Sequence, residues 1–313
     1  MRWSFSAARA FRQCQRSWFF KNCLASAVAK DRQRRTAYLL SKLQSVSGWR
    51  GRLVDRILSE RLVLALRRGQ RITKADLRTA AKVCFERELD FAINNRIHEP
   101  ALELSKNDAV AAFRAIEYGH GIRQEEIAQA WQDIQTAIDN VFKMDGLRAA
   151  LKRASYVVAQ RSLQFKFAGV SVVAVPDVIA FNEKAPPLIV DWKVHSFGTR
   201  DYRLQLALYA LSLSRCTPHR DFPPVLTEFT PTDYRLVEAQ LLSGIEHEYA
   251  LDSADFDELE DYVAASATEM LAATDGLKNG DLRAEDFAVT AWPNVCQRCA
   301  YQKICWEKAD EAA

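Results

Sequence analysis

Residues 176–194 read PDVIAFNEKAPPLIVDWKV and carry two aspartates and a lysine on two short apolar runs. A Pro-Pro pair separates the runs, which is typical of two β-strands joined by a turn. Because side chains alternate along a strand, Asp191 and Lys193 should project to one face and Trp192 to the other. If the two strands pair, Asp177 can face Asp191 across the ladder.

This arrangement has a chemical interpretation and an ordinary one. Two facing carboxylates repel each other, and Mg²⁺ or Mn²⁺ bound by Asp177 and Asp191 would relieve that repulsion. Such a cation could polarise a phosphodiester and lower the pKa of a bound water, while Lys193 orients the nucleophile or stabilises developing negative charge. The alternative is two surface strands with charged ends, because Asp-X-Lys is a short pattern that also occurs by chance.

The remainder of the chain predicts a mixed α/β protein. Helical periodicity runs through residues 36–150, and residues 4–29 predict a further helix with Ser4 or Ser6 as its N-cap. From Tyr156 the pattern changes to β-branched, alternating runs. The later predictions are a helix at 200–214, strands at 223–230 and 234–242, and an acidic amphipathic helix at 255–273. Strands interleaved with helices indicate a sheet core covered by helices.

We therefore expect three consecutive segments. Residues 1–155 would form a basic helical region, residues 156–280 the α/β core, and residues 281–313 a cysteine-bearing segment that closes onto the N-terminus. Within the predicted helix of the core, Gln205 and Tyr209 are four residues apart and share one face. They are polar members of an apolar stripe, so that face meets either a polar site or a core in which the tyrosine hydroxyl is satisfied.

Charge is unevenly distributed along the chain. Residues 1–56 contain thirteen Lys or Arg and two acids, a net charge of +11, and the whole chain has a formal charge of +3, which leaves −8 for the remainder. A basic block of this kind attracts polyanions such as nucleic acid, although a solvated basic helix face gives the same composition. The acidic stretch at residues 246–262 would repel a phosphate backbone.

Three of the seven cysteines cluster near the C-terminus with the spacing C-x2-C-x5-C, at Cys296, Cys299 and Cys305. Short loops of this kind can point several sulfurs at one centre, either an iron–sulfur cluster or a zinc ion, and spacing alone does not separate the two. The fourth ligand would come from the distant Cys14, with Cys23 as the competitor. No apolar run reaches the length of a membrane span and no secretory signal is evident, so we expect a cytoplasmic protein that contacts no membrane.

Taken together, VPDVIA, the thirteen residues between the aspartates, VDWK and YRLQLALYAL resemble the PD-(D/E)XK nuclease superfamily. The likeness is to the RecB/AddB-type nuclease domain that is shared with CRISPR-adaptation nucleases. It implies a restriction-endonuclease-like mixed β-sheet core flanked by helices. It also implies that Asp177, Asp191 and the Trp192 main-chain carbonyl bind the metal, that Lys193 is the catalytic lysine, and that Gln205 and Tyr209 contact DNA or the reacting phosphate.

The sequence departs from the family pattern at two positions. The family usually has a histidine where GWRGRLVDRIL places Asp55, and we expect Asp55 to be a metal ligand because aspartate suits a hard cation. The family commonly carries a glutamate near Gln160, whose neutral amide lowers the negative charge around the site. These departures support an alternative in which the protein is a catalytically weakened or inactive DNA-binding or scaffold subunit.

The resemblance also bears on the cysteines and on the basic block. Relatives of the cluster-bearing kind have one cysteine in an N-terminal helix and three at the C-terminus, which implies a 4Fe-4S cluster on Cys14, Cys296, Cys299 and Cys305, with Zn²⁺ as the chemical alternative. Such a centre would join the two ends of the chain. The expected DNA-contacting residues are Arg9, Arg12, Arg16, Arg50, Arg52 and Arg56.

The function expected is a Mg²⁺- or Mn²⁺-dependent deoxyribonuclease that acts on single-stranded DNA or duplex ends, as an exonuclease or in end processing. The sequence has no Walker A pattern, so a helicase or other ATPase would be a separate polypeptide. Relatives work beside helicases in DNA repair or in CRISPR and phage defence, which implies a protein partner. A zinc-stapled protein with no role on nucleic acid is the second alternative.

Overall fold

The computed structural model describes residues 1–97, 110–195, 201–223, 228–274 and 281–305. The chain divides into two compact units that interleave along the sequence. The first unit comprises residues 1–2, 47–85 and 124–264, and the second comprises residues 3–46, 86–123 and 265–313. Each unit is built from segments that are distant in sequence. The expected division into three consecutive segments stays a prediction.

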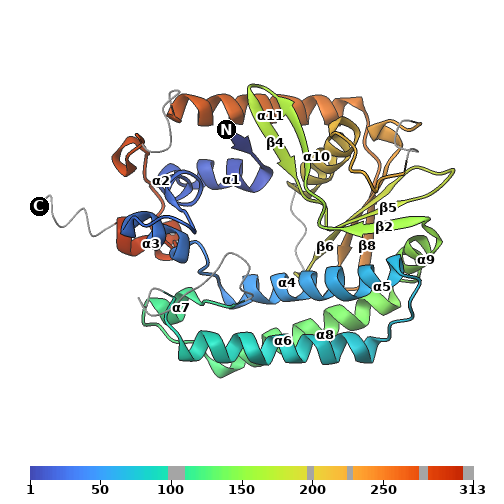
Figure 1. The fold of residues 1–313 in the computed structure, drawn as a ribbon, viewed down its shortest axis with the longest axis horizontal. Helices are drawn as coiled ribbons and strands as arrows, with labels where there is room; N and C mark the ends of the chain where they lie inside the picture. Colours follow the sequence, from blue (N-terminus) through green and yellow to red (C-terminus); the bar gives the residue numbers. More distant parts are fainter. Residues whose placement is uncertain (98–109, 196–200, 224–227, 275–280, 306–313) are drawn as a thin grey trace, which may run out of the picture. The chain divides into compact units, whose positions relative to one another are not determined.

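The strands of the first unit form a mixed five-stranded sheet and a separate hairpin (Figure 1). The sheet has the order β2-β5-β6-β7-β8 and contains β2 (Tyr156–Ala159), β5 (Val178–Phe181), β6 (Leu188–Lys193), β7 (Arg235–Gln240) and β8 (Ile245–Tyr249). Neighbours are antiparallel except β6 and β7, which run parallel. The hairpin pairs β3 (Leu163–Phe167) with β4 (Val170–Ala174). This is the mixed α/β fold that the sequence predicts.

Pro176 lies between two strands that belong to different sheets. β4 ends at Ala174 in the hairpin, whereas β5 begins at Val178 in the five-stranded sheet. Proline has no N–H to donate to a ladder, so the chain turns there and passes from one sheet to the other. Asp177 therefore lies at a corner between two sheets, directly before the first paired residue of β5.

Helices cover the five-stranded sheet of the first unit. The helical elements are α4 (Val46–Ile57), η2 (Leu58–Val63), α5 (Leu64–Arg67), α6 (Lys74–Asn94), α8 (Gln124–Lys143), α9 (Asp145–Arg153), α10 (Asp201–Arg215), η4 (Pro231–Asp233) and α11 (Ser253–Thr274), of which α6 and α11 end in the second unit. α10 packs against β3, β4, β6 and β7, and α5 and η2 pack against β2. Figure 1 shows α10 and the α4–α5 segment on opposite sides of this sheet.

The second unit is helical and has an aromatic core. Its elements are α1 (Phe5–Gln13), α2 (Gln15–Phe19), η1 (Phe20–Leu24), α3 (Arg32–Leu40), α7 (Arg114–Glu117), η5 (Ala284–Asp286) and α12 (Pro293–Gln297), and β1 (Arg2–Trp3) begins in the first unit. Phe19 stacks on Phe287 with ring centroids 4.7 Å apart, and Phe20 meets Tyr301 at 5.4 Å. The N-terminal aromatic residues are therefore core residues that join the two ends of the chain.

Most predicted elements are present, with local differences. The helix expected over residues 4–29 begins at the Ser4 cap but is interrupted at Cys14 and ends in the π-helical η1. The predicted helices at 200–214 and 255–273 correspond to α10 and α11, and the strand at 234–242 to β7. Part of the strand expected at 223–230 lies outside the described residues. β8 was not predicted, because its sequence IEHEY is charged and exposed.

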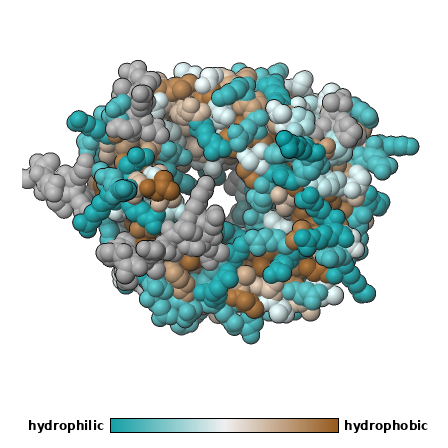
Figure 2. Space-filling view, in the orientation of Figure 1, coloured by the Kyte–Doolittle hydropathy of each residue, from teal (hydrophilic) through white to brown (hydrophobic). Residues whose placement is uncertain are grey.

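The visible surface in Figure 2 is mainly hydrophilic, with apolar side chains in small separate patches. No helix in the described part of the chain is long and apolar enough to span a membrane.

Candidate active site

The candidate site of the first unit begins with Asp177 and Asp191 at neighbouring strand ends. Val178 pairs with Val190 in the antiparallel ladder between β5 and β6, so the register continues to Asp177 opposite Asp191. The main-chain N–H of Trp192 donates to Asp177 Oδ2 at 2.7 Å, which fixes that carboxylate against β6. Asp191 is 3% exposed, and the ammonium group of Lys193 contacts its Oδ2. The predicted shared face of Asp191 and Lys193 is thus observed.

α10 supplies the two polar residues that the sequence singled out. Gln205 Nε2 donates to the Tyr209 hydroxyl at 2.5 Å, and both groups lie 3.4 Å from Asp191 Oδ1. Gln205 Oε1 accepts from Lys193 Nζ at 3.3 Å. The structure favours the polar site for this helix face, because both side chains contact Asp191 and Gln205 also contacts Lys193.

Asp55 reaches the same site from α4, and Gln160 connects it to Asp177. The amide nitrogen of Gln160 donates to Asp55 Oδ1 at 2.8 Å and to Asp177 Oδ1 at 3.0 Å. Ser59 donates to Asp55 Oδ1 at 3.3 Å. The π-helical η2 begins three residues after Asp55, and π-helical turns inside helices are frequent at functional sites.

Gln160 adopts an unusual backbone conformation. Its φ is 53°, in the left-handed region that few non-glycine residues occupy, and its N–H donates to the Asp177 carbonyl at 3.1 Å. This conformation directs the side chain toward both aspartates. A strained backbone conformation of this kind is kept only where many surrounding contacts hold it in place. Such conformations are common at functional sites.

Burial and mutual repulsion perturb the three acids in the same direction. Desolvation, followed by the charges of Asp191 and Asp55, holds the pKa of Asp177 well above its usual range. Desolvation also raises the pKa of Asp191, and Lys193 opposes that effect. The pKa of Asp55 is raised by burial and lowered in part by its hydrogen bonds to Ser59 and Gln160. Clustered acids with raised pKa values are what a bound cation would stabilise in their charged form.

Two residues near the acids were not identified from the sequence. Glu238 of β7 is buried and lies opposite Asp191 in the parallel register, and its charge contributes to the raised pKa of Asp191. Its carboxylate accepts from Gln240 Nε2 at 3.0 Å and from the Tyr249 hydroxyl at 2.7 Å. The sequence feature that could have identified Glu238 is the presence of a charged residue inside the otherwise apolar strand that begins at Arg235. The other residue is Tyr202, whose ring lies 4.7 Å from Lys193 Nζ.

The acids of this site have the chemistry of hard-cation ligands, although they are not arranged as a metal-binding group in this structure. Asp55, Asp177 and Asp191 supply carboxylate oxygens, which Mg²⁺ and Mn²⁺ prefer. Positive or hydrogen-bond-donating groups, the Gln160 amide and the Lys193 ammonium, lie against these oxygens. No group of three or more His, Cys, Asp or Glu side chains within the described ranges is arranged so that it could hold a metal ion. The expected ligand role of the Trp192 carbonyl stays a prediction.

The four predicted cysteine ligands come together in the second unit. Cys14, Cys296, Cys299 and Cys305 line one cavity of about 280 Å³. Tyr301 N–H donates to Cys299 Sγ at 3.3 Å, and burial raises the pKa of both Cys299 and Cys305, with the neighbouring Cys14 as a further cause. Cys23, the competing ligand, is buried and does not line this cavity. The four thiols share this cavity but are not arranged as a metal-binding group, so an iron–sulfur cluster or a zinc ion at this place stays a prediction.

The six arginines expected to contact DNA are divided between the two units. In the first unit, Arg50 pairs with Asp133 and donates to the Val194 carbonyl, so its guanidinium is already engaged. In the second unit, Arg16 Nε donates to the Phe287 carbonyl at 3.2 Å, and Arg12 lies 3.9 Å from Glu269. DNA contacts by these residues, and by Arg9, Arg52 and Arg56, stay predictions.

Comparison with known proteins defines the class. The profile of the PD-(D/E)XK nuclease superfamily matches residues 2–306, so the chain belongs to that superfamily. No curated protein matches the chain. A solved structure described as SSO0001 is similar at 13% sequence identity, covering 72% of this chain and 96% of that chain with a TM-score of 0.31. A likeness this distant supports no conclusion about function.

Proposed function

We propose that the protein is a Mg²⁺- or Mn²⁺-dependent deoxyribonuclease of the RecB/AddB type that processes single-stranded DNA or duplex ends. The observation that carries this proposal is the contact network of Asp191, Lys193, Gln205 and Tyr209, beside which the Trp192 main-chain N–H holds the Asp177 carboxylate. Membership of the PD-(D/E)XK nuclease superfamily supports nuclease chemistry. The basic N-terminal block supports a polyanionic substrate.

In this proposal Asp55, Asp177 and Asp191 would hold the cation. When bound, a divalent cation supplies Lewis acidity, which polarises the scissile phosphate and lowers the pKa of an attacking water. The protein then contributes position and charge. Lys193 is held between Asp191 and the Gln205 carbonyl oxygen beneath the Tyr202 ring, where its ammonium can orient the water or stabilise negative charge that develops on the phosphate.

Gln205 and Tyr209 have a positioning role in the same network. Their short mutual hydrogen bond and their contacts with Asp191 restrict the rotamers available to the acid and the lysine. A reacting group held in one geometry lowers the entropic part of the barrier. Either side chain can also donate to a phosphate oxygen of the DNA.

We propose that Cys14, Cys296, Cys299 and Cys305 hold a structural 4Fe-4S cluster, with Zn²⁺ as the alternative. The shared cavity and the Tyr301 N–H donated to Cys299 support a thiolate-bound centre. Anaerobic purification, visible absorption, and iron and zinc analysis test the assignment. A colourless protein with stoichiometric zinc would show that the centre is a zinc ion and not a cluster. Cys299→Ser is expected to lose the bound metal, whichever it is.

Cleavage assays test the nuclease assignment. Single-stranded and duplex DNA are incubated with Mn²⁺ and the wild type, Asp191→Asn or Lys193→Met, and each variant is expected to be slower by about a hundredfold or more, since both remove charge at the reacting centre. Asp257→Asn and Lys184→Met are matched changes at exposed positions away from the site and should cleave normally.

The second candidate, a non-catalytic DNA-binding or scaffold subunit of a helicase, CRISPR or phage-defence complex, is favoured by one observation. The Gln160 amide occupies the position between Asp55 and Asp177, in a family that commonly carries a glutamate near it. DNA binding by the wild type with equal, background cleavage in all variants would establish this alternative.

A further inference from the structure

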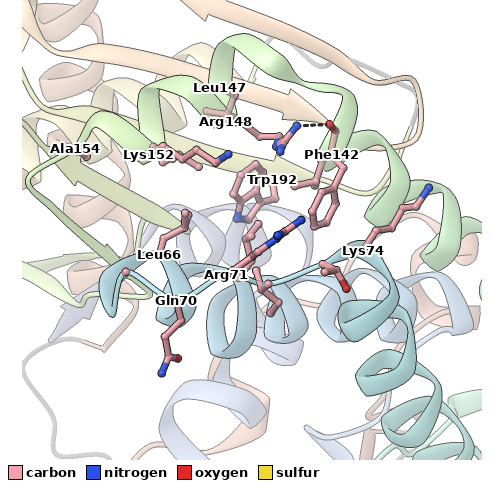
Figure 3. A pocket seen from close by; sticks show the side chains of 16 residues that line it. Leu66, Gln70, Arg71, Lys74, Phe142, Leu147, Arg148, Lys152, Ala154 and Trp192 are labelled. Carbon is pink, nitrogen blue, oxygen red and sulfur yellow. Dashed lines mark hydrogen bonds between the residues drawn. The ribbon is translucent and has the colours of Figure 1, made fainter.

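A second cavity lies behind the strand that carries Asp191 and Lys193. Its volume is about 740 Å³, and it is lined by residues of the first unit, among them Trp192 (Figure 3). Because side chains alternate along β6, Trp192 faces the side of the sheet opposite to Asp191 and Lys193. The cavity is therefore separate from the acid site although it shares a strand with it.

The lining of this cavity is positively charged. Arg71, Lys74, Arg148 and Lys152 contribute to it, and no acidic residue does. Lys74 lies 3.7 Å from Asp139, and Arg148 lies 3.3 Å from Asp145, so these two charges are partly compensated. Figure 3 shows Arg71 beside the Trp192 indole and Lys152 extending toward it from the other side.

Arg71 and Lys152 have no ion-pair partner among the residues that the structure describes. Two uncompensated cations on opposite sides of one cavity favour an anion between them. A ligand that carries a phosphate group would meet both charges, and the arginine can donate two parallel hydrogen bonds to phosphate oxygens.

The indole of Trp192 provides an independent indication of a ligand. The residue is 6% exposed, and its Nε1–H has no hydrogen-bond partner within the described part of the chain. A buried donor left unpaired is destabilising, so such groups are rare without a partner. An acceptor on a bound molecule would satisfy this donor.

The walls of the cavity are aromatic and aliphatic. Phe142 and Trp192 line it together with leucines such as Leu62, Leu66 and Leu147. Its volume falls within the roughly 300–1,000 Å³ range of small-molecule sites. Inorganic phosphate would leave these apolar walls uncovered, and a fatty acid would bring hydrocarbon against four cations. A nucleotide has both an aromatic base for the walls and a phosphate for the cations.

We propose that this cavity binds a nucleoside 5′-phosphate, with the base against Phe142 and Trp192 and the phosphate between Arg71 and Lys152. The same chemistry is presented by a free nucleotide and by the 5′-phosphorylated end of a DNA strand. The proposal concerns binding behind β6 and does not depend on hydrolysis at the acid site.

Isothermal titration calorimetry on the full chain in EDTA tests the proposal, because the acid site then has no added cation to attract a phosphate. The probes are ADP, a 5′-phosphorylated trinucleotide, inorganic phosphate and dodecanoate. We expect one site per chain for ADP or for the trinucleotide. Arg71→Ala and Lys152→Ala should each weaken binding about tenfold, the effect of losing about 1.4 kcal/mol of charged contact.

Arg153→Ala is the matched control for Lys152→Ala, since Arg153 is the next residue of α9, is exposed and does not line the cavity. Trp192→Phe keeps an aromatic ring but removes the N–H and should also weaken binding. If this variant fails to fold, Arg71→Ala and Lys152→Ala still test the proposal, because both change exposed side chains. Preference for ADP identifies a free nucleotide, and preference for the trinucleotide identifies a strand end. The proposal is overturned by no binding of either, by binding that Arg71→Ala and Lys152→Ala leave unchanged, or by equal binding of phosphate or dodecanoate.

Discussion

Replacement of Gln160 by glutamate would convert the bridge between Asp55 and Asp177 into a third carboxylate. The wild-type amide donates to both acids, at 2.8 Å and 3.0 Å. Hydrogen bonds to charged groups contribute about 1.5–3 kcal/mol each, and the exposure of Gln160 places its two bonds at the low end, about 3 kcal/mol together. The left-handed backbone strain is the same in both proteins, so it does not enter the difference.

The glutamate would also meet two like charges. At about 3 Å each repulsion is worth about 1.4 kcal/mol even in a water-like dielectric, but the exposed side chain can rotate into solvent and avoid it. We therefore expect a loss of about 3 kcal/mol in EDTA, which corresponds to a fall in Tm of roughly 6–12 °C.

Thermal unfolding of wild type and Gln160→Glu in EDTA and in Mn²⁺ provides the assay. A cation that binds only the folded state stabilises it according to its affinity, and an additional carboxylate ligand increases that affinity, so the difference in Tm should narrow or reverse in Mn²⁺. Gln164→Glu, at an exposed position of β3, is the matched control and should change little. Equal Tm values for wild type and Gln160→Glu in EDTA would refute the bridging role.

Three further predictions concern other parts of the molecule. The pKa of Asp177 is raised in the folded protein, so the folded state retains a proton that the unfolded chain releases at lower pH. The free energy of unfolding of the metal-free protein should therefore fall as the pH rises from the unfolded-state pKa of this aspartate to its folded-state pKa. Urea titrations at several pH values should show a smaller fall for Asp177→Asn. Tyr209→Phe removes a hydroxyl that contacts Asp191 and Gln205, so it should lower kcat while changing KM and Tm little. A change in KM alone would contradict a positioning role. Phe287→Ala removes a fully buried ring stacked on Phe19, and calorimetry should show the second unit destabilised by about 3–5 kcal/mol with the acid site unaffected.

Local pattern predicted much of the site because its key residues lie on regular elements. The alternation of VDWK placed Asp191 and Lys193 on one face of β6, and the helical spacing of Gln205 and Tyr209 placed them together on α10. These relations depend only on the periods of strands and helices. The antiparallel pairing that brings Asp177 opposite Asp191 followed from a short connection between two apolar runs.

Features that depend on long-range packing were not predicted. Gln160 was interpreted as the loss of an acid, whereas its left-handed backbone and its double hydrogen bond make it a bridge, and nothing local in AQRS indicates that conformation. The contribution of Glu238 depends on the parallel register between β6 and β7, two strands separated by α10. β8 was missed because an exposed edge strand lacks the apolar alternation on which strand prediction relies.

The interleaving of the two units has a consequence for how the protein is made. Asp55 leaves the ribosome more than a hundred residues before Gln160, Asp177 and Asp191, so its contact with Gln160 cannot form until the later segment has been synthesised. Contacts of such large sequence separation form slowly. A shortened chain that starts at residue 156 would keep Asp177, Asp191 and α10 but would lack Asp55, and its β2 would lose the cover provided by η2 and α5.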